Sequence, residues 1–543
     1  MNAADGTCES ITSQSEMLIH GASAESLFRL ACMRQAQGDI DGAGDALDAL
    51  IDIDPASVQA WSNRGILHLI KDQPGQAAAC LRQAAELAPT EARIVLNLGV
   101  AIKSQGDLVA AVEIFERAIA LEDGLTMAHV NLCTTLQSLG RFDSAIEAGQ
   151  RATQLAPELA LAHNNLATAL QRAGRHDEAR TGYERAAKLA PDWHLPWLNL
   201  GELSLLRDDA EDAISNFRQC VLRQPHCAEA HFDLSLALLQ RGEFTEGWQE
   251  YEWRWGGPTP TSPPTGVDAP FWNGQALEGS VILLYTEQGI GDNIQFIRFA
   301  GALQRRGGTV WVRAPATLGR LFQTCDGVAR VIVEGERLPG PVDYQLPLMS
   351  VPRVLGNSWT SELGTCAYLS APGELGPAVP DLRRPRLRSI GIVWSGNPHF
   401  VHNAERSCNA ADFMPLCRIP GLHIVSLQHG ERARDLAALR NLEIVDLSDR
   451  MGDFSDTADI IQQLDLVISV DTSIPHLAAA LGKPVWLLLH SRPDWRWMRH
   501  FDRCMWYPTM RLFRQSAPGE WSGVFKRIQM QLSEWVNVGE AAP

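Results

Sequence analysis

Lysine is scarce in this chain of 543 residues. Only five lysines occur: Lys71, Lys103, Lys188, Lys483 and Lys526. An anionic ligand must therefore be bound mainly by arginine, helix N-termini or backbone amides. The net charge of -17 also argues against a nucleic-acid partner, because binding the phosphate backbone requires clustered cations.

The eleven cysteines are an odd number and include no C-x-x-C pair. This usage predicts a reduced, cytoplasmic chain with neither a disulfide framework nor a zinc site, and no metal is expected. The first 23 residues are polar and lack an apolar core, so no secretory signal is predicted. Apolar runs such as Val485–Leu489 have the length of strands and not of membrane spans.

Three kinds of residue recur every 34 positions. Proline fills one register, in which Asp123 takes the remaining place: Pro55, Pro89, Pro157, Pro191 and Pro225. A second register is alanine or glycine: Ala43, Ala77, Ala111, Ala145, Ala179, Ala213 and Gly247. A third holds only small residues: Ala31, Gly65, Gly99, Cys133, Ala167, Gly201 and Ser235. This period predicts an α-solenoid of tetratricopeptide helix pairs, which are binding surfaces rather than catalysts.

The periodicity also sets the expected domain boundaries. We expect a disordered leader at residues 1–23, an array of about seven helix pairs at 24–255 and a Pro/Gly-rich linker at 256–272. Aromatic residues at the end of the array are suited to capping the solenoid or docking it: Trp248, Tyr251, Trp253 and Trp255.

Beyond the linker, short apolar runs alternate with helical stretches in two series, at residues 273–380 and 381–543, and the second ends in a helix. This alternation predicts two Rossmann-like lobes of parallel sheet with a cleft between them. The expected strands are Val281–Tyr285, Thr309–Arg313, Arg330–Val333, Ile390–Trp394, His423–Leu427, Leu442–Val445, Leu466–Val470 and Val485–Leu489.

Asparagine forms a fourth register, two residues before the small one: Asn63, Asn97, Asn131, Asn165 and Asn199. On a helix this position points roughly 150° away from the buried stripe, so stacked repeats would align five carboxamides on an open surface. A carboxamide both donates and accepts, and can pair with both groups of a peptide backbone. The register predicts a groove for an extended protein client. The alternative is that asparagine is an ordinary occupant of this tetratricopeptide position.

The first strand of the second half ends in a loop that contains two glycines. Gly289 and Gly291 would let a ligand approach the start of a helix expected from about Asn293, where free amides attract anions. Asp292 would lie in the cleft and take a proton from an acceptor hydroxyl. The alternative is that Asp292 is the N-cap of the helix and Gln295 completes a capping box. The two roles are compatible.

A second loop joins the strand Leu466–Val470 to a helix through Asp471, Thr472 and Ser473. Such a junction exposes hydroxyls and amides at the carboxyl end of a parallel sheet, where ligands of these folds bind. His476 lies one turn into the helix and would face a diphosphate or a sugar. The alternative is a core histidine whose hydrogen bonds are satisfied.

A third loop begins at Ser395, after the strand Ile390–Trp394, and leads to Arg406. Arg406 would neutralise a phosphate in this lysine-poor chain, and the alternative is a solvated surface arginine. The aromatic and basic run Asp494–Trp497 is consistent with a cleft wall or with a core role for its tryptophans.

These loops resemble motifs of the heptosyltransferase-like branch of GT-B glycosyltransferases, and the resemblance covers about residues 273 to 535. The Gly291-Asp292 turn resembles the N-lobe motif that carries the proposed base. Asp471–Ala478 resembles the C-lobe donor motif D-[ST]-G-x-x-H-[LV]-[AT], with Ser473 in place of its glycine. The phosphate-facing lysine of the family has no counterpart, and the cation near its place is an arginine.

The resemblance implies an α-solenoid followed by an α/β GT-B fold of two Rossmann-like lobes. It implies metal-independent transfer from a nucleotide sugar, with Asp292 as the base and no other cofactor. The implied donor-binding residues are Gly289, Gly291, Ser395, Arg406, Asp471, Thr472, Ser473 and His476.

The whole chain is similar to bacterial proteins that fuse a tetratricopeptide array to such a domain, some of which are proposed to glycosylate flagellin. Its layout parallels the nucleocytoplasmic O-GlcNAc transferases. The expected function is that of a cytoplasmic protein O-glycosyltransferase whose partners are a nucleotide sugar and a protein client, with flagellin as a candidate. Two alternatives remain: a non-catalytic scaffold with a degenerate transferase domain, and a glycan or lipopolysaccharide glycosyltransferase.

Overall fold

The computed structural model describes residues 23–257, 267–364, 367–373, 380–400, 403–499 and 501–538. The chain forms two compact units, and helix α13 is divided between them. The expected leader at 1–23 and linker at 256–272 lie largely outside the described residues. Among the residues that are described, no helix is both long enough and apolar enough to cross a membrane.

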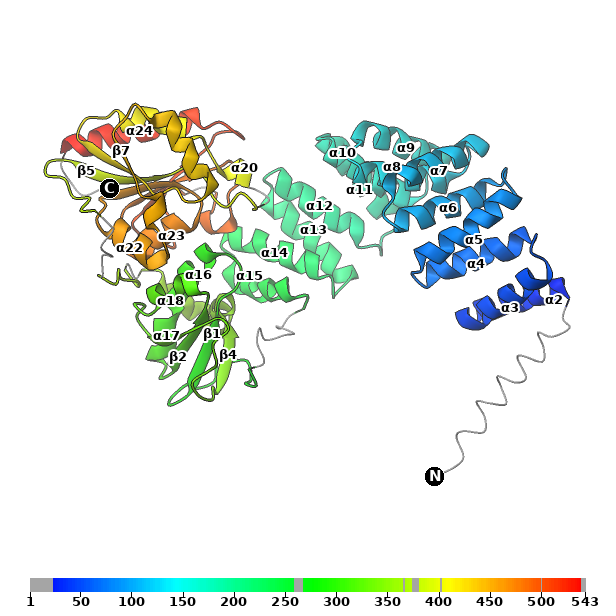
Figure 1. Ribbon diagram of the computed structural model, residues 1–543, viewed down its shortest axis with the longest axis horizontal. Helices are drawn as coiled ribbons and strands as arrows, with labels where there is room; N and C mark the ends of the chain where they lie inside the picture. Colours follow the sequence, from blue (N-terminus) through cyan, green and yellow to red (C-terminus); the bar gives the residue numbers. More distant parts are fainter. Residues whose placement is uncertain are drawn as a thin grey trace, which may run out of the picture. The chain divides into compact units, whose positions relative to one another are not determined.

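The first unit is a helical solenoid in which consecutive helices form hairpins that stack along the chain (Figure 1). Its helices are α2 (Ala24–Ala36), α3 (Ile40–Ile53), α4 (Val58–Ile70), α5 (Pro74–Leu87), α6 (Ala92–Ser104), α7 (Leu108–Leu121), α8 (Thr126–Ser138), α9 (Phe142–Leu155), α10 (Ala160–Arg172), α11 (His176–Leu189), α12 (Leu195–Leu206) and most of α13 (Ala210–Arg223). The predicted solenoid is confirmed.

The small-residue register follows from the contact between paired helices. A Cβ on Gly65 would lie 2.5 Å from Leu81 Cγ, and a Cβ on Gly99 would lie 2.5 Å from the ring of Phe115. Both distances are too short for a real side chain, so only glycine lets the large residue of the second helix pack against the first.

The second unit begins with a helix pair, α14 (Ala228–Arg241) and α15 (Phe244–Glu250), and the 3₁₀ turn η1 (Tyr251–Trp255). The sequence of this helix pair continues the 34-residue registers of the solenoid, yet the pair belongs to the same compact unit as the two sheets. The reason is packing, because Leu239, Trp248 and Tyr251 belong to the same buried cluster as the first sheet.

Two fully parallel sheets follow the helix pair. The four-stranded sheet, in order β3-β2-β1-β4, consists of β1 (Val281–Tyr285), β2 (Thr309–Ala314), β3 (Val328–Val333) and β4 (Tyr344–Pro347). The six-stranded sheet, in order β10-β9-β8-β5-β6-β7, consists of β5 (Arg388–Val393), β6 (Leu422–Ser426), β7 (Ile444–Asp446), β8 (Leu466–Val470), β9 (Val485–Leu489) and β10 (Met510–Arg514).

The connecting helices are α16 (Ile290–Phe296), α17 (Ala300–Arg305), α18 (Ala316–Phe322), α19 (Val351–Leu355), α20 (Asn403–Arg406), α21 (Met414–Cys417), α22 (Phe454–Gln462), α23 (Ser473–Ala480) and α24 (Ser522–Val538). All eight expected strands are present, with ends shifted by at most two residues. Strands β4 and β10 were not expected, because the first is short and contains glutamine and proline and the second has two arginines among its five residues.

Each sheet has a point at which its strand order reverses. The six-stranded order is the doubly wound order of dinucleotide-binding folds, and it reverses between β5 and β8. The four-stranded sheet reverses between β1 and β4. Ligands of such folds bind at the carboxyl ends of the strands at these points. The loops after β5, β8 and β1 are those that the sequence indicates as functional.

Candidate functional site

The loop after β1 reaches its helix earlier than expected. Helix α16 begins at Ile290 rather than near Asn293, because the chain turns at Gln288, whose φ is +56°. The N-cap is Gly289, and the predicted N-cap role of Asp292 is wrong. Asp292 instead lies in the first turn, and its Oδ2 accepts a hydrogen bond of 2.9 Å from the Gly289 amide. Burial raises the pKa of Asp292.

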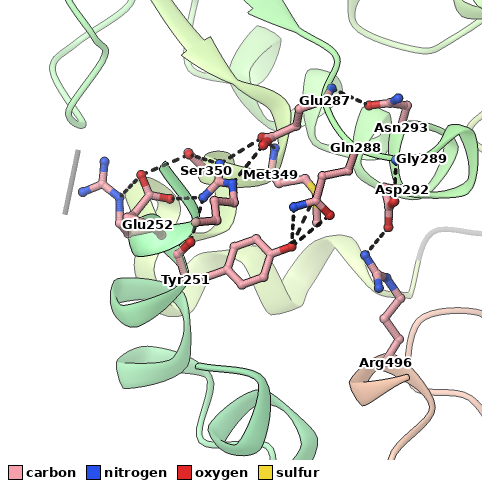
Figure 2. A network of polar contacts seen from close by, with 12 residues as sticks. Tyr251, Glu252, Glu287, Gln288, Gly289, Asp292, Asn293, Met349, Ser350 and Arg496 are labelled. Carbon is pink, nitrogen blue, oxygen red and sulfur yellow. Dashed lines mark hydrogen bonds and ion pairs between the residues drawn. The ribbon is translucent and has the colours of Figure 1, made fainter. Parts of the chain in front are cut away.

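Gln295 does not complete a capping box either. Its side chain is fully buried, and its Oε1 accepts a hydrogen bond of 2.8 Å from Arg496 Nε. The same arginine forms an ion pair with the carboxylate of Asp292 through Nη2 (Figure 2). Asp292 and Arg496 are 204 residues apart in the chain, so the loop after β1 is joined to the loop after β9.

The loop after β8 has the geometry that the sequence predicts. Thr472 is the N-cap of α23, and its Oγ1 accepts a hydrogen bond of 3.3 Å from the amide of Ile474. Asp471 Oδ2 accepts a hydrogen bond of 2.7 Å from Trp497 Nε1. Burial, together with the negative charge of Asp494, raises the pKa of Asp471 to about 6. Asp471 therefore gains a proton under mildly acidic conditions.

His476 is buried and has polar partners on both sides of its ring. Its Nδ1 lies 3.0 Å from the hydroxyl of Tyr507, and its Nε2 lies 4.0 Å from Asp471 Oδ1. Burial lowers the pKa of His476 well below its ordinary value, so the imidazole is neutral at physiological pH.

The loops after β1 and β8 meet at a glycine. A Cβ on Gly291 would lie 3.0 Å from His476 Cδ2 and 3.6 Å from the Cα of Ser473. A Cβ on Gly289 would lie 2.9 Å from Asp292 Oδ2. The space beside both glycines is therefore occupied by atoms of the chain itself, and the structure brings the loop after β1 into contact with the loop after β8.

The end of the repeat array occupies the reversal point of the first sheet (Figure 2). Arg254 of η1 donates to both carboxylate oxygens of Glu287, which follows β1, at 2.8 and 2.9 Å. It also donates to Ser350 Oγ, which follows β4, at 2.8 Å and to Glu252 at 3.0 Å. The carboxylate of Glu287 also accepts a hydrogen bond of 3.0 Å from the amide of Met349. This buried network fixes the loop that carries Asp292.

Aromatic packing strengthens the same junction. Trp248 meets Phe296, Trp359 and Trp495 edge to face, with ring centroids 5.4 to 6.0 Å apart. The hydroxyl of Tyr251 forms hydrogen bonds with the side-chain amide of Gln288. The aromatic residues at the end of the array thus dock the last helix pair on the sheets.

In the loop after β5, the predicted site residues form hydrogen bonds with other residues of the chain. Ser395 is buried; its amide donates to Gln428 Oε1 at 2.9 Å, and its hydroxyl lies 3.1 Å from Ser407 Oγ. Arg406 is half-buried, with its Nε 3.3 Å from Asn403 Oδ1. Burial lowers the pKa of Arg406, and the negative charge of Asp471 opposes this shift, so Arg406 lies in the electric field of Asp471.

The five asparagines of the array are all half-buried. The side-chain amide nitrogens of Asn63 and Asn131 donate hydrogen bonds to the backbone carbonyl four residues earlier, at 2.8 and 2.9 Å. Their side-chain oxygens take no part in these two bonds. The amide of Asn199 donates to Asn164 Oδ1 of the preceding repeat at 3.0 Å. The asparagines therefore share a helix position but not one hydrogen-bond pattern.

Three residues of this region had no assigned role in the sequence: Arg254, Glu287 and Tyr507. Tyr251 was indicated only as part of the aromatic end of the array, and Arg496 and Trp497 only as part of the run Asp494–Trp497. The concentration of tryptophan and arginine in Tyr251–Trp255 and Asp494–Trp497 was the only available signal. Among the described residues, no group of three or more histidine, cysteine, aspartate or glutamate side chains could hold a metal ion.

Family models match both halves of the chain. Tetratricopeptide-repeat models match residues 25–57, 71–124, 124–192 and 198–252. The model of glycosyltransferase family 9 (heptosyltransferase) matches residues 425–491, which contain β8 and the loop of Asp471, Thr472 and Ser473. The chain joins tetratricopeptide repeats to a heptosyltransferase-like domain.

The chain is 25% identical over 389 residues to Protein FlbA of Caulobacter vibrioides, an alignment that covers 62% of this chain and 60% of that protein. The match thus spans about three fifths of the length of this curated relative. Among solved structures, MamA is 27% identical, covering 30% of this chain and 94% of its own, with a TM-score of 0.28. PilW, a type IV pilus biogenesis factor, is 19% identical, covering 39% and 98%, with a TM-score of 0.37.

Proposed function

We propose that this protein is a protein O-glycosyltransferase that transfers a sugar from a nucleotide-sugar donor to a serine or threonine hydroxyl of a client held by the repeats. One observation carries the proposal: the loop of Asp292 lies against the loop of Asp471 and His476, although the two follow different sheets. The second loop lies within the segment that matches glycosyltransferase family 9. The sugar donor and the acceptor hydroxyl must meet for transfer to occur, and the contact between these two loops is where we expect them to meet.

Asp292 would act as the general base. The acceptor oxygen attacks the anomeric carbon of the donor, the bond from that carbon to the phosphate oxygen breaks, and the electron pair leaves with the nucleotide. The proton of the acceptor hydroxyl passes to Asp292. Burial raises the pKa of this carboxyl, which makes its ionised form a stronger base.

The departing phosphate would be stabilised by Arg406 and by the N-terminus of α23, next to Thr472 and Ser473. These groups supply positive charge and backbone donors, so we propose a two-lobed GT-B mechanism that needs no metal. We place Gly291 in this donor region because it lets the acceptor-side loop approach His476 closely, and Gly289 because its amide holds the Asp292 carboxylate.

The client would lie in the groove of the repeats and use the asparagines as backbone partners. Their half-buried positions and regular spacing support this role. We propose that the protein acts in the cytoplasm, with flagellin as the first client to test.

One observation favours the scaffold alternative. Both oxygens of Asp292 already have donors, the Gly289 amide and Arg496, as would suit a purely structural carboxylate. Each oxygen retains a second lone pair, so the acceptor hydroxyl can still be bound. A thermal-shift panel separates the two functions, because a scaffold is not stabilised by any nucleotide and a transferase is stabilised by the nucleotide of its donor.

Intact mass spectrometry of the client tests the proposal. Flagellin from cells that lack the protein should be lighter than the wild-type form by the mass of a sugar. Expression of the wild-type chain should restore that mass, and Asp292→Asn should not. The control is Asp449→Asn, at an exposed aspartate, which should restore it. Restoration of the full mass by Asp292→Asn would refute the assignment of the base.

The role of the array has its own test. Replacing both Asn131 and Asn165 by alanine should raise the KM for the client about tenfold without changing kcat, because uniform binding is lost and the chemical step is untouched. Gln154→Ala, at an exposed residue of α9, is the matched control. An unchanged KM in the double variant would show that the client binds elsewhere.

A further inference from the structure

The turn after β9 contacts both of the proposed reactive loops. It consists of Asp494 and η8 (Trp495–Trp497). Arg496 forms an ion pair with Asp292 on the acceptor side, as Figure 2 shows. The next residue, Trp497, donates a hydrogen bond of 2.7 Å to Asp471 on the donor side. Adjacent residues of one short turn therefore hold the two carboxylates of the site.

The guanidinium group of Arg496 is held in one orientation by its partners. Its Nη1 donates to Asp494 Oδ1 at 2.8 Å, its Nε donates to Gln295 Oε1 at 2.8 Å, and its guanidinium lies 4.5 Å from the ring centroid of Trp495. Only 8% of its side chain is exposed. Because its nitrogens are engaged by these partners, Arg496 acts through Asp292 rather than by binding the phosphate of a donor.

The electrostatic surroundings explain why a fixed cation is needed. The titratable and charged groups that act on Asp292 are Arg496, Asp494 and Tyr251, and His476 lies against the neighbouring Gly291. Burial and the charge of Asp494 favour the protonated form of Asp292, whereas Arg496 favours the ionised form. A protonated carboxyl cannot accept the proton of an acceptor hydroxyl. Without Arg496 the pKa of Asp292 would be higher still, and the base would stay protonated up to a higher pH.

We propose that Arg496 is a positioning residue that orients the Asp292 carboxylate and stabilises its ionised form. This inference rests on the proposed function. Its charge sets the protonation of Asp292, and its hydrogen-bond geometry sets the direction of the carboxylate. The two contributions are separable, because lysine keeps the charge and loses the planar fork, whereas methionine loses both.

The first test is the pH profile of kcat/KM for Arg496→Lys and Arg496→Met, with Arg440→Met as the control at an exposed arginine. We expect Arg496→Met to reduce kcat/KM about 100-fold at pH 7 and to move the acidic limb to higher pH. Arg496→Lys should be slower than wild type with its acidic limb near the wild-type position. The control should match wild type. A slower Arg496→Met enzyme with an unmoved limb would contradict the proposal.

The second test does not depend on turnover. Thermal unfolding of wild type, Asp292→Asn, Arg496→Met and the double variant forms a cycle that measures the coupling of the two side chains. We expect a favourable coupling that increases from pH 4 to pH 7, as Asp292 ionises. An active enzyme without coupling would overturn the role of Arg496. A coupled pair in a protein that transfers no sugar to any client would overturn the proposed function instead.

Discussion

The ion pairs between the end of the repeat array and the loop after β1 make a quantitative prediction. Arg254 is 5% exposed and bonds to Glu287, which is 6% exposed, and to Glu252, which is 1% exposed. Arg254→Met keeps a long apolar side chain but removes the charge that both carboxylates share, although Glu252 retains its ion pair with Arg353 at 3.4 Å. We therefore expect the second unit to lose stability with little change in packing volume.

The magnitude follows from the burial of the partners. Removing one member of a buried ion pair costs about 3–5 kcal/mol, because the other charge is left without compensation. The amide of Met349 and the hydroxyl of Ser350 still donate to the carboxylates, which places the expected loss at the lower end, about 3 kcal/mol. Because Glu287 lies on the loop of Asp292, the proposed transfer should slow as well.

Urea unfolding monitored by tryptophan fluorescence measures this loss in the full chain. All but three of the 16 tryptophans lie beyond residue 225, so the signal reports mainly on the second unit. Arg440→Met, at an exposed arginine, should change the free energy of unfolding by less than about 0.5 kcal/mol. Adding Glu287→Gln to Arg254→Met should recover part of the loss. A loss below about 1 kcal/mol, or no recovery in the double variant, would refute the reasoning.

Two further predictions concern the junction of the loops. Gly291→Ala adds a methyl group 3.0 Å from the ring of His476, so it should lower the free energy of unfolding by about 1–3 kcal/mol and slow transfer. Gly523→Ala, whose methyl group meets open space, is the control and should do neither. Equal activity of the two variants would contradict this prediction. The pKa of Asp471, raised to about 6 in the folded state, means that its ionisation opposes folding. Asp471→Asn, which can still accept from Trp497, should match wild type in free energy of unfolding near pH 4. It should exceed wild type increasingly up to about pH 6, by up to about 3 kcal/mol; a stability difference that does not depend on pH would contradict this.

The repeats and most strands could be predicted because their signals are local. A helix pair packs mainly against its neighbours, so the requirement for a small residue at Gly99 recurs every 34 positions and is visible in the sequence. Buried parallel strands such as β9, which is a continuous apolar run, and β8, which is apolar except for Ser469, stand out in the sequence. The unpredicted strand β10 has two arginines among its five residues, and it pairs with strand β9, whose partner residues lie 25 positions earlier in the chain.

The candidate site could be predicted only in part. The turn of Asp471, Thr472 and Ser473 is a strand-to-helix junction with its own cap, and its geometry followed from the local sequence. The start of α16 did not, because a positive φ at Gln288 has no sequence signature comparable to a glycine.

The sequence by itself determined the architecture, a solenoid followed by parallel α/β sheets, and the loops that end at the functional edges of those sheets. Only the tertiary structure decided which loops meet and which charges face one another. Arg254 and Glu287 are 33 residues apart, and Arg496 and Asp292 are 204 residues apart. No periodicity links such pairs. Their contact results from the packing of two sheets and a helix pair into one core, and burial in that core sets the strength of their interaction.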